Sequence, residues 1–176
     1  MTTLRVTPTR RHSVRRAALI ATMTIIAGSV LTITSAKATD PVGVTTTILT
    51  GPDSLPGFTI HLKTDNWKIR MEANSATDVY VVDNVFAANA NTGWHSHPGP
   101  SIITVLSGTI TSYEGDDPMC TPHFHPAGTA FVDQGGTHVH LLRNEGTDTA
   151  ETIATQLIPA GADRRLDEPD PGFCPF

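Results

Sequence analysis

Short apolar segments alternate with polar turns along the chain after residue 40. Nine segments are rich in Val, Ile, Thr, Tyr and Phe, the residue types typical of β-strands. They are 44–49, 58–62, 67–72, 78–86, 102–106, 109–113, 129–132, 138–143 and 149–157. Gly, Pro, Asn and Asp separate them, and no stretch in this part keeps a 3.6-residue period long enough to predict a helix. Many short strands predict an all-β sandwich, jelly roll or barrel.

The first 38 residues have the pattern of an export signal. Five arginines lie between Arg5 and Arg16, and residues 17–36 follow without a charge. Ala36-Lys37-Ala38 then supplies the small residues of a signal-peptide cleavage site. The alternative is a retained N-terminal membrane anchor, because about 20 uncharged residues can span a bilayer. Several Thr and Ser residues make this segment less hydrophobic, so we predict a secretory signal peptide over 1–38 and a secreted protein that begins at Thr39.

Cleavage would make the chain strongly acidic. Six of the 12 Lys and Arg residues precede Thr39, whereas all 17 Asp and Glu residues follow it, so the mature chain has a formal charge of −11 with neutral histidines. An acidic surface disfavours nucleic acids and anionic membranes. We therefore expect no nucleic-acid partner and no stable membrane insertion after cleavage. Removing 38 of 176 residues leaves 138, the length of one ordinary domain.

The only two cysteines, Cys120 and Cys174, both lie after the export signal. In an exported protein this predicts one disulfide, with two unrelated thiols as the alternative. Residues 163–176 contain three prolines and a glycine, which predicts an irregular tail tied back by Cys174. The expected organisation is therefore a barrel domain over 39–162 and a proline-rich tail over 163–176.

Six histidines form three His-x-His pairs, at 95/97, 123/125 and 138/140. Side chains at positions i and i+2 of a strand point to the same face, so each pair could offer two imidazoles to one ion. Imidazole suits Zn, Cu, Fe and Ni. The pattern predicts a transition-metal site built on strands.

The residues around two of these pairs resemble the motifs of the cupin family. His95-Ser96-His97 is followed by Ser101, where cupins usually carry a Glu, and by Gly108, where their first motif closes with a Gly. His140 and Asn144, with three residues between them, resemble the second motif. The resemblance implies a single-domain jelly-roll β-barrel, a metal ion bound by the motif histidines and, often, a homodimer. It implies no single reaction, because cupins include dioxygenases, decarboxylases, isomerases, storage proteins and sugar sensors.

On this resemblance, His95, His97 and His140 are the expected metal ligands, and His138 is a candidate fourth. Ser101 departs from the family pattern, because a hydroxyl is a poor substitute for a carboxylate ligand. Three neutral imidazoles leave the charge of a divalent ion uncompensated, which favours an anionic ligand such as a small organic acid. They also favour Zn, Fe or Cu over Mn.

The remaining candidates receive more modest roles. Trp94 and Ser101 are expected in the pocket, with core packing as the alternative for Trp94. Asn144 is expected to stabilise a turn, and His61 to face solvent. The pair at 123 and 125 is expected on a loop or an edge strand at the surface.

Three classes of function stay open at this point. We favour a secreted metal-binding protein without an assigned reaction. The first alternative is a metal-dependent enzyme, dioxygenase- or decarboxylase-like, that acts on a small organic acid. The second is a metal-free barrel with a small-ligand pocket. The motif positions offer no evident general base, which favours binding over catalysis.

Overall fold

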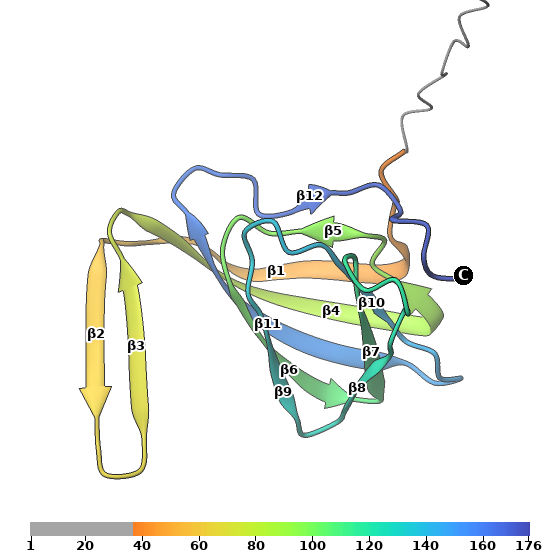
Figure 1. Cartoon of the computed structure of the whole chain (residues 1–176), viewed down its shortest axis with the longest axis horizontal. Coiled ribbons are helices and arrows are strands. Elements are labelled where there is room, and N and C mark those ends of the chain that lie inside the picture. Colours follow the sequence, from red (N-terminus) through yellow and green to blue (C-terminus); the bar gives the residue numbers. More distant parts are fainter. Residues whose placement is uncertain (1–36) are drawn as a thin grey trace, which may run out of the picture. The chain divides into compact units, whose positions relative to one another are not determined.

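The computed structural model describes residues 37–176 (Figure 1). The predicted signal peptide over 1–38 lies almost entirely outside this range and stays a prediction. The described residues belong to one compact unit. They form strands, turns and loops but no helix, and therefore no helix that could cross a membrane.

The described part of the chain contains twelve strands. They are β1 (Val42–Leu55), β2 (Phe58–Lys63), β3 (Lys68–Ala73), β4 (Thr77–Asn91), β5 (His95–Ser96), β6 (Ser101–Ser107), β7 (Thr109–Glu114), β8 (His123–Pro126), β9 (Ala130–Asp133), β10 (His140–Arg143), β11 (Ala150–Pro159) and β12 (Leu166–Asp167).

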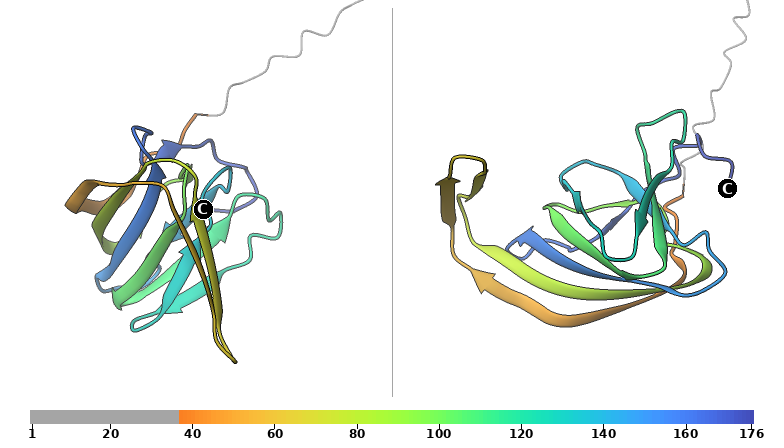
Figure 2. Two further views of the ribbon diagram at one scale, coloured as in Figure 1. Left: turned by 90° about the vertical axis from the view of Figure 1, so that its left-hand side faces the viewer. Right: turned by 90° about the horizontal axis from the view of Figure 1, so that it is seen from below.

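Ten of these strands form one antiparallel sheet that curls into a nearly closed barrel (Figures 1 and 2). The main path runs β12-β5-β10-β4-β11-β6-β9; β1 adds to β4, β7 adds to β10 and β8 adds to β7. The long strand β4 pairs with β1 and with β11 over most of its length. The predicted all-β jelly-roll barrel is confirmed.

The barrel interior follows from the two-residue period of its strands. Burial alternates along β6 and β11, so one side chain in two faces the core. The main core cluster comprises Val82, Phe86, Ala90, Ile103, Val105, Ile110, Leu142, Ala150 and Ala154. A second cluster joins Trp94, Tyr113 and Leu141, of which Trp94 directly precedes His95 and Leu141 directly follows His140 in the sequence.

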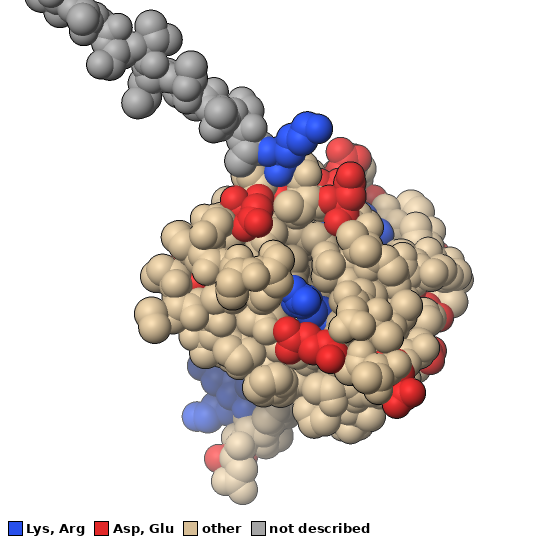
Figure 3. Space-filling model, turned by 90° about the vertical axis from the view of Figure 1, so that its right-hand side faces the viewer, with Lys and Arg blue, Asp and Glu red and all other residues tan. Residues whose placement is uncertain are grey.

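Strands β2 and β3 pair only with each other and form a hairpin that projects from the far ends of β1 and β4 (Figure 2). The apolar side chains of Ile60 and Leu62 on this hairpin are exposed. On the face shown in Figure 3, acidic side chains lie in several separate groups with basic ones between them.

The C-terminal tail is more ordered than expected. Its strand β12 pairs with β5, and the amide of Glu168 donates a hydrogen bond to the carbonyl of Trp94 at 2.9 Å. Cys120, between β7 and β8, forms the expected disulfide with Cys174. Backbone pairing and the disulfide together hold the tail against the barrel wall that carries the histidines.

Candidate metal centre

Three of the motif histidines meet inside the barrel. His95 opens β5 and pairs directly across the sheet with His140, which opens β10. His97 follows β5. The ring centroids lie 4.3 Å apart for His95 and His140, 4.9 Å for His95 and His97, and 5.6 Å for His97 and His140. One ligand atom from each ring lies within 4.8 Å of the other two, and we call these three residues the three-histidine centre.

Backbone carbonyls orient two of the rings. Nδ1 of His95 lies 3.0 Å from the carbonyl oxygen of Gly93, and Nδ1 of His97 lies 2.6 Å from that of Arg164. A carbonyl only accepts, so each Nδ1 carries the proton and each Nε2 keeps its lone pair for an ion. Gly93 has φ +67°, and an added Cβ would collide with the Thr39 carbonyl, so this orienting turn requires glycine.

His140 supplies the test of whether a metal fits here. Its side chain is only 3% exposed, yet neither ring nitrogen has a hydrogen-bond partner. Leaving a buried polar group unpaired costs about 1–3 kcal/mol. A cation among the three rings would satisfy one of these nitrogens, so the residues present fit a metal ion.

Burial also sets the protonation state that a metal needs. Removal from water lowers the pKa of His95 well below its usual value, lowers that of His97, and lowers that of His140 to about 4. The three imidazoles are therefore neutral near pH 7. Because metal ions bind neutral imidazole, no proton competes strongly for these ligands at that pH.

A small cavity of about 80 Å³ adjoins the three-histidine centre, and Arg164 and Arg165 line it. Arg164 donates to the side-chain oxygen of Gln156 at 2.9 Å, and Arg165 to the carbonyl of Thr92 at 2.7 Å. Burial lowers the pKa of Arg164, although it stays cationic at neutral pH. These two arginines escaped the sequence analysis, because only Cys174 indicated that the tail returns to the barrel.

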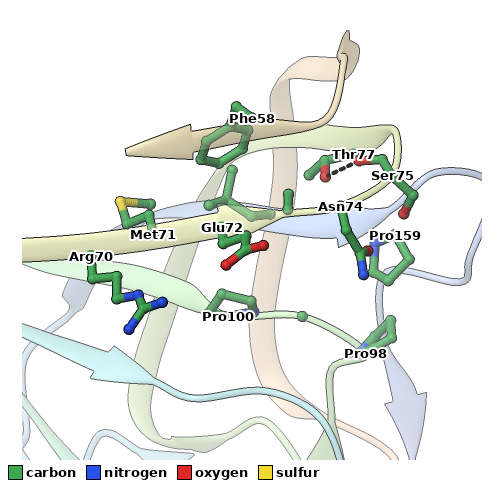
Figure 4. A pocket seen from close by; sticks show the side chains of 13 residues that line it. Phe58, Arg70, Met71, Glu72, Asn74, Ser75, Thr77, Pro98, Pro100 and Pro159 are labelled. Atoms are coloured by element: carbon green, nitrogen blue, oxygen red, sulfur yellow. Dashed lines mark hydrogen bonds between the residues drawn. The ribbon is translucent and has the colours of Figure 1, made fainter. Parts of the chain in front are cut away.

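A larger cleft of about 590 Å³ lies away from the histidines, between the β2–β3 hairpin and the barrel. Figure 4 shows Pro98, Pro100 and Pro159 beside it, opposite Phe58 and Met71. Its lining contains no histidine or cysteine. The candidate metal site is therefore identified by the nitrogen ligands around the smaller cavity and not by the volume of the cleft.

Comparisons with known proteins give similarity at the level of the fold. No protein-family model and no curated protein matches the chain. The polyketide cyclase RemF from Streptomyces resistomycificus is 16% identical with a TM-score of 0.50, over 78% of this chain and 84% of that chain. A Klebsiella pneumoniae protein with a double-stranded β-helix domain is 18% identical (TM-score 0.44, 65% and 80% covered), and a cupin superfamily protein from Desulfitobacterium hafniense is 13% identical (TM-score 0.40, 58% and 77% covered). The likeness to RemF concerns the fold alone, an antiparallel β-barrel.

Within this barrel, two expected pocket residues lie outside the histidine cavity. Trp94 is 2% exposed, packs with Tyr113 and Leu141, and does not line the histidine cavity. Trp94 therefore takes the alternative role considered for it, core packing, at a bend that directly precedes β5. Ser101 is buried outside the lining of this cavity as well, where its hydroxyl donates to Asp133 at 3.5 Å.

His138 differs from its expected position. The strand begins only at His140, so the argument that both side chains share a strand face does not apply. His138 is part-exposed and lies near two carboxylates, those of Glu114 and Asp133. It joins a second group of potential ligands, Asp133, His138 and His140.

Asn144 and the three remaining histidines of the described chain lie outside both groups of potential metal ligands. The buried amide of Asn144 donates to backbone carbonyls and its oxygen accepts from the amide of Gly146 at 3.0 Å, so the predicted turn role is confirmed. His61 is exposed on β2. On β8, His123 is exposed, while His125 stacks on Phe131 with ring centroids 3.8 Å apart.

Proposed function

We propose that this chain is a secreted metal-binding protein of cupin fold that holds a divalent transition ion with His95, His97 and His140. The observation that carries the proposal is the buried cluster of three neutral imidazoles, two of them oriented by carbonyls and the third without any hydrogen-bond partner. Nitrogen ligands favour Zn, Fe or Cu over Mn. When bound, such an ion would act as a Lewis acid toward an anion or water beside it.

We further propose that the small ligand is an organic acid. Arg164 adds positive charge to the cavity beside the three rings, and Arg165, which also pairs with Asp167 at 2.7 Å, lines it as well. None of the three proposed ligands is a carboxylate. A planar guanidinium fork matches the two oxygens of a carboxylate. The cavity of about 80 Å³ is far below the range for drug-sized ligands, so a compact acid fits better than a sugar or an aromatic compound.

Secretion is part of the proposal. The Cys120–Cys174 disulfide suits an oxidising compartment, and the export pattern of residues 1–38 would deliver the chain there. Intact-mass measurement of the exported protein tests this point. A mass that begins at Thr39 supports it, whereas a full-length chain in the membrane fraction would indicate an anchor.

Metal analysis of protein purified through its export route tests the function. We expect a bound transition metal that a chelator removes and Zn²⁺ restores. Calorimetric titration with oxalate, a compact dicarboxylate probe, should then show binding to the Zn²⁺-loaded protein, weakened at least about tenfold by Arg165→Gln, since a charge-assisted hydrogen bond contributes about 1.5–3 kcal/mol. Protein that neither contains metal nor takes up Zn²⁺ would contradict the proposal.

A further inference from the structure

The second ligand group, Asp133, His138 and His140, adjoins the three-histidine centre and shares His140 with it. Its ligand atoms also lie within 4.8 Å of one another. We propose that this group binds a second divalent transition ion, so that His140 gives one ring nitrogen to each ion. The inference rests on the proposed function, which assigns the other nitrogen of His140 to the ion of the three-histidine centre.

His140 has an unused nitrogen whichever ion is considered alone. Both Nδ1 and Nε2 are buried without a hydrogen-bond partner, and one ion in the three-histidine centre can take only one of them. Nδ1 lies 3.7 Å from Oδ1 of Asp133, beyond hydrogen-bond distance. A second ion between this nitrogen and the carboxylate would give the buried nitrogen of His140 a partner.

Two separations in the second ligand group lie close to those of a coordinated ion. A tetrahedral Zn²⁺ with ligand bonds of about 2.0–2.2 Å holds its ligand atoms about 3.3–3.6 Å apart. Oδ1 of Asp133 lies 3.7 Å from Nδ1 of His140 and 3.4 Å from Nδ1 of His138. Small adjustments would therefore bring the three atoms into one coordination shell.

Polar contacts hold this group in place as they hold the first. Nδ1 of His138 makes a long hydrogen bond of 3.4 Å with Oδ1 of Asp133, and Nε2 lies 2.6 Å from Oε2 of Glu114. An ion held between Nδ1 and Asp133 would replace this long hydrogen bond and leave Nε2 facing the carboxylate of Glu114. Asp133 is itself fixed, since Oδ1 accepts from the amide of Gly135 at 3.0 Å and Oδ2 from Ser101 at 3.5 Å.

The surroundings of the two groups differ in charge. His138 lines a surface cleft of about 330 Å³ together with Asp116, Glu168 and Asp170, whose carboxylates would attract a cation. The cavity beside the three-histidine centre carries Arg164 and Arg165 instead. Cations would enter by the acidic cleft, and anions by the arginine-lined cavity. Coordination on both sides of His140 releases its ring proton to solvent, because neutral imidazole has one free nitrogen.

Zn²⁺ stoichiometry of the chelator-stripped mature protein, measured by native mass spectrometry, tests the inference. We expect two Zn²⁺ per wild-type chain and one per chain for Asp133→Asn and for His138→Gln. His123→Gln removes a histidine outside both groups and should keep two. Circular dichroism checks that each variant is folded, and the partial exposure of His138 makes His138→Gln the safer variant.

The outcomes separate this inference from the proposed function. A wild-type chain that binds one Zn²⁺, lost on His97→Ala and kept on Asp133→Asn, would overturn the second ion and leave the three-histidine centre intact. A chain that binds none would overturn both. Electron paramagnetic resonance with Cu²⁺ tests the sharing of His140: two coupled ions should lose signal as the second equivalent is added. Full signal from two equivalents would show two separate ions and contradict the bridge.

Discussion

Two of the His-x-His pairs have the same spacing but different surroundings. His95 and His97 lie inside the barrel, where β10 places His140 directly opposite His95. His123 and His125, which we call the β8 pair, lie on a strand that pairs on one side only, with β7. There His123 is exposed, and His125 has partners of its own in Ser112 and Phe131. The His-x-His spacing therefore gives a candidate metal site only where a neighbouring strand supplies a third imidazole and the rings are buried from water.

The largest expected effect comes from removing one ring of each pair. His97→Ala should weaken Zn²⁺ binding at the three-histidine centre at least about a thousandfold, because a lost ligand costs more than the 10- to 100-fold typical of its outer partners. The matched change His123→Ala should leave that affinity unaltered. Competition with a chelating dye measures both. Equal losses in the two variants would show that the β8 pair takes part in binding.

The second effect concerns how the tail reaches the inner site. Cys120→Ser or reduction should lower the free energy of unfolding by up to about 4 kcal/mol, as loop-closure entropy gives for a separation of 54 residues. It should also weaken oxalate binding, because the tail carries Arg164 and Arg165. Denaturant unfolding with and without reductant measures the first, and calorimetry the second. Unchanged oxalate affinity in a folded, reduced protein would show that Arg164 and Arg165 do not contribute to the proposed ligand site.

The third effect is a pH dependence confined to the buried rings. Burial lowers the pKa of His140 from 6.5 to about 4. In the metal-free protein, the unfolded chain therefore takes up a proton near pH 6.5, while the folded chain does so only near pH 4. Stability should fall as the pH drops through this window, and the folded variant His140→Gln should show a shallower fall. Urea unfolding at several pH values measures this, and parallel curves for the two proteins would contradict a neutral, buried His140.

The smallest effect is expected at Ser101. Ser101→Ala should change Zn²⁺ affinity at the three-histidine centre less than about tenfold, because its hydroxyl contacts Asp133 and Gln156 but none of the three rings. The dye competition used for His97→Ala provides the measurement. A loss as complete as that of His97→Ala would place Ser101 among the ligands.

Part of the barrel could be predicted from local pattern, because burial follows a two-residue period along β6 and β11. The segment at 102–106 falls within β6, where Ile103 and Val105 are buried, and the segment at 149–157 begins one residue before β11. The segment at 138–143 was placed too early, since backbone pairing starts at His140. A short strand gives too few alternating positions to mark its first residue.

The chemistry around the site was harder to predict, because it depends on contacts between distant residues. His95, His97 and His140 were identified from motif spacing, and the structure brings them together. No motif spacing in the sequence indicated that Asp133, Arg164 or Arg165 lies near these histidines. Arg164 reaches the site because its carbonyl accepts from His97, 67 positions earlier, and no local pattern encodes that contact.

The most direct test is a crystal structure of the Zn²⁺-soaked mature protein with anomalous data at the zinc edge. The account predicts an anomalous peak about 2.0–2.1 Å from Nε2 of His95 and of His97, and at the same distance from one ring nitrogen of His140. An ion on the β8 pair, or no peak among the three rings, would contradict it.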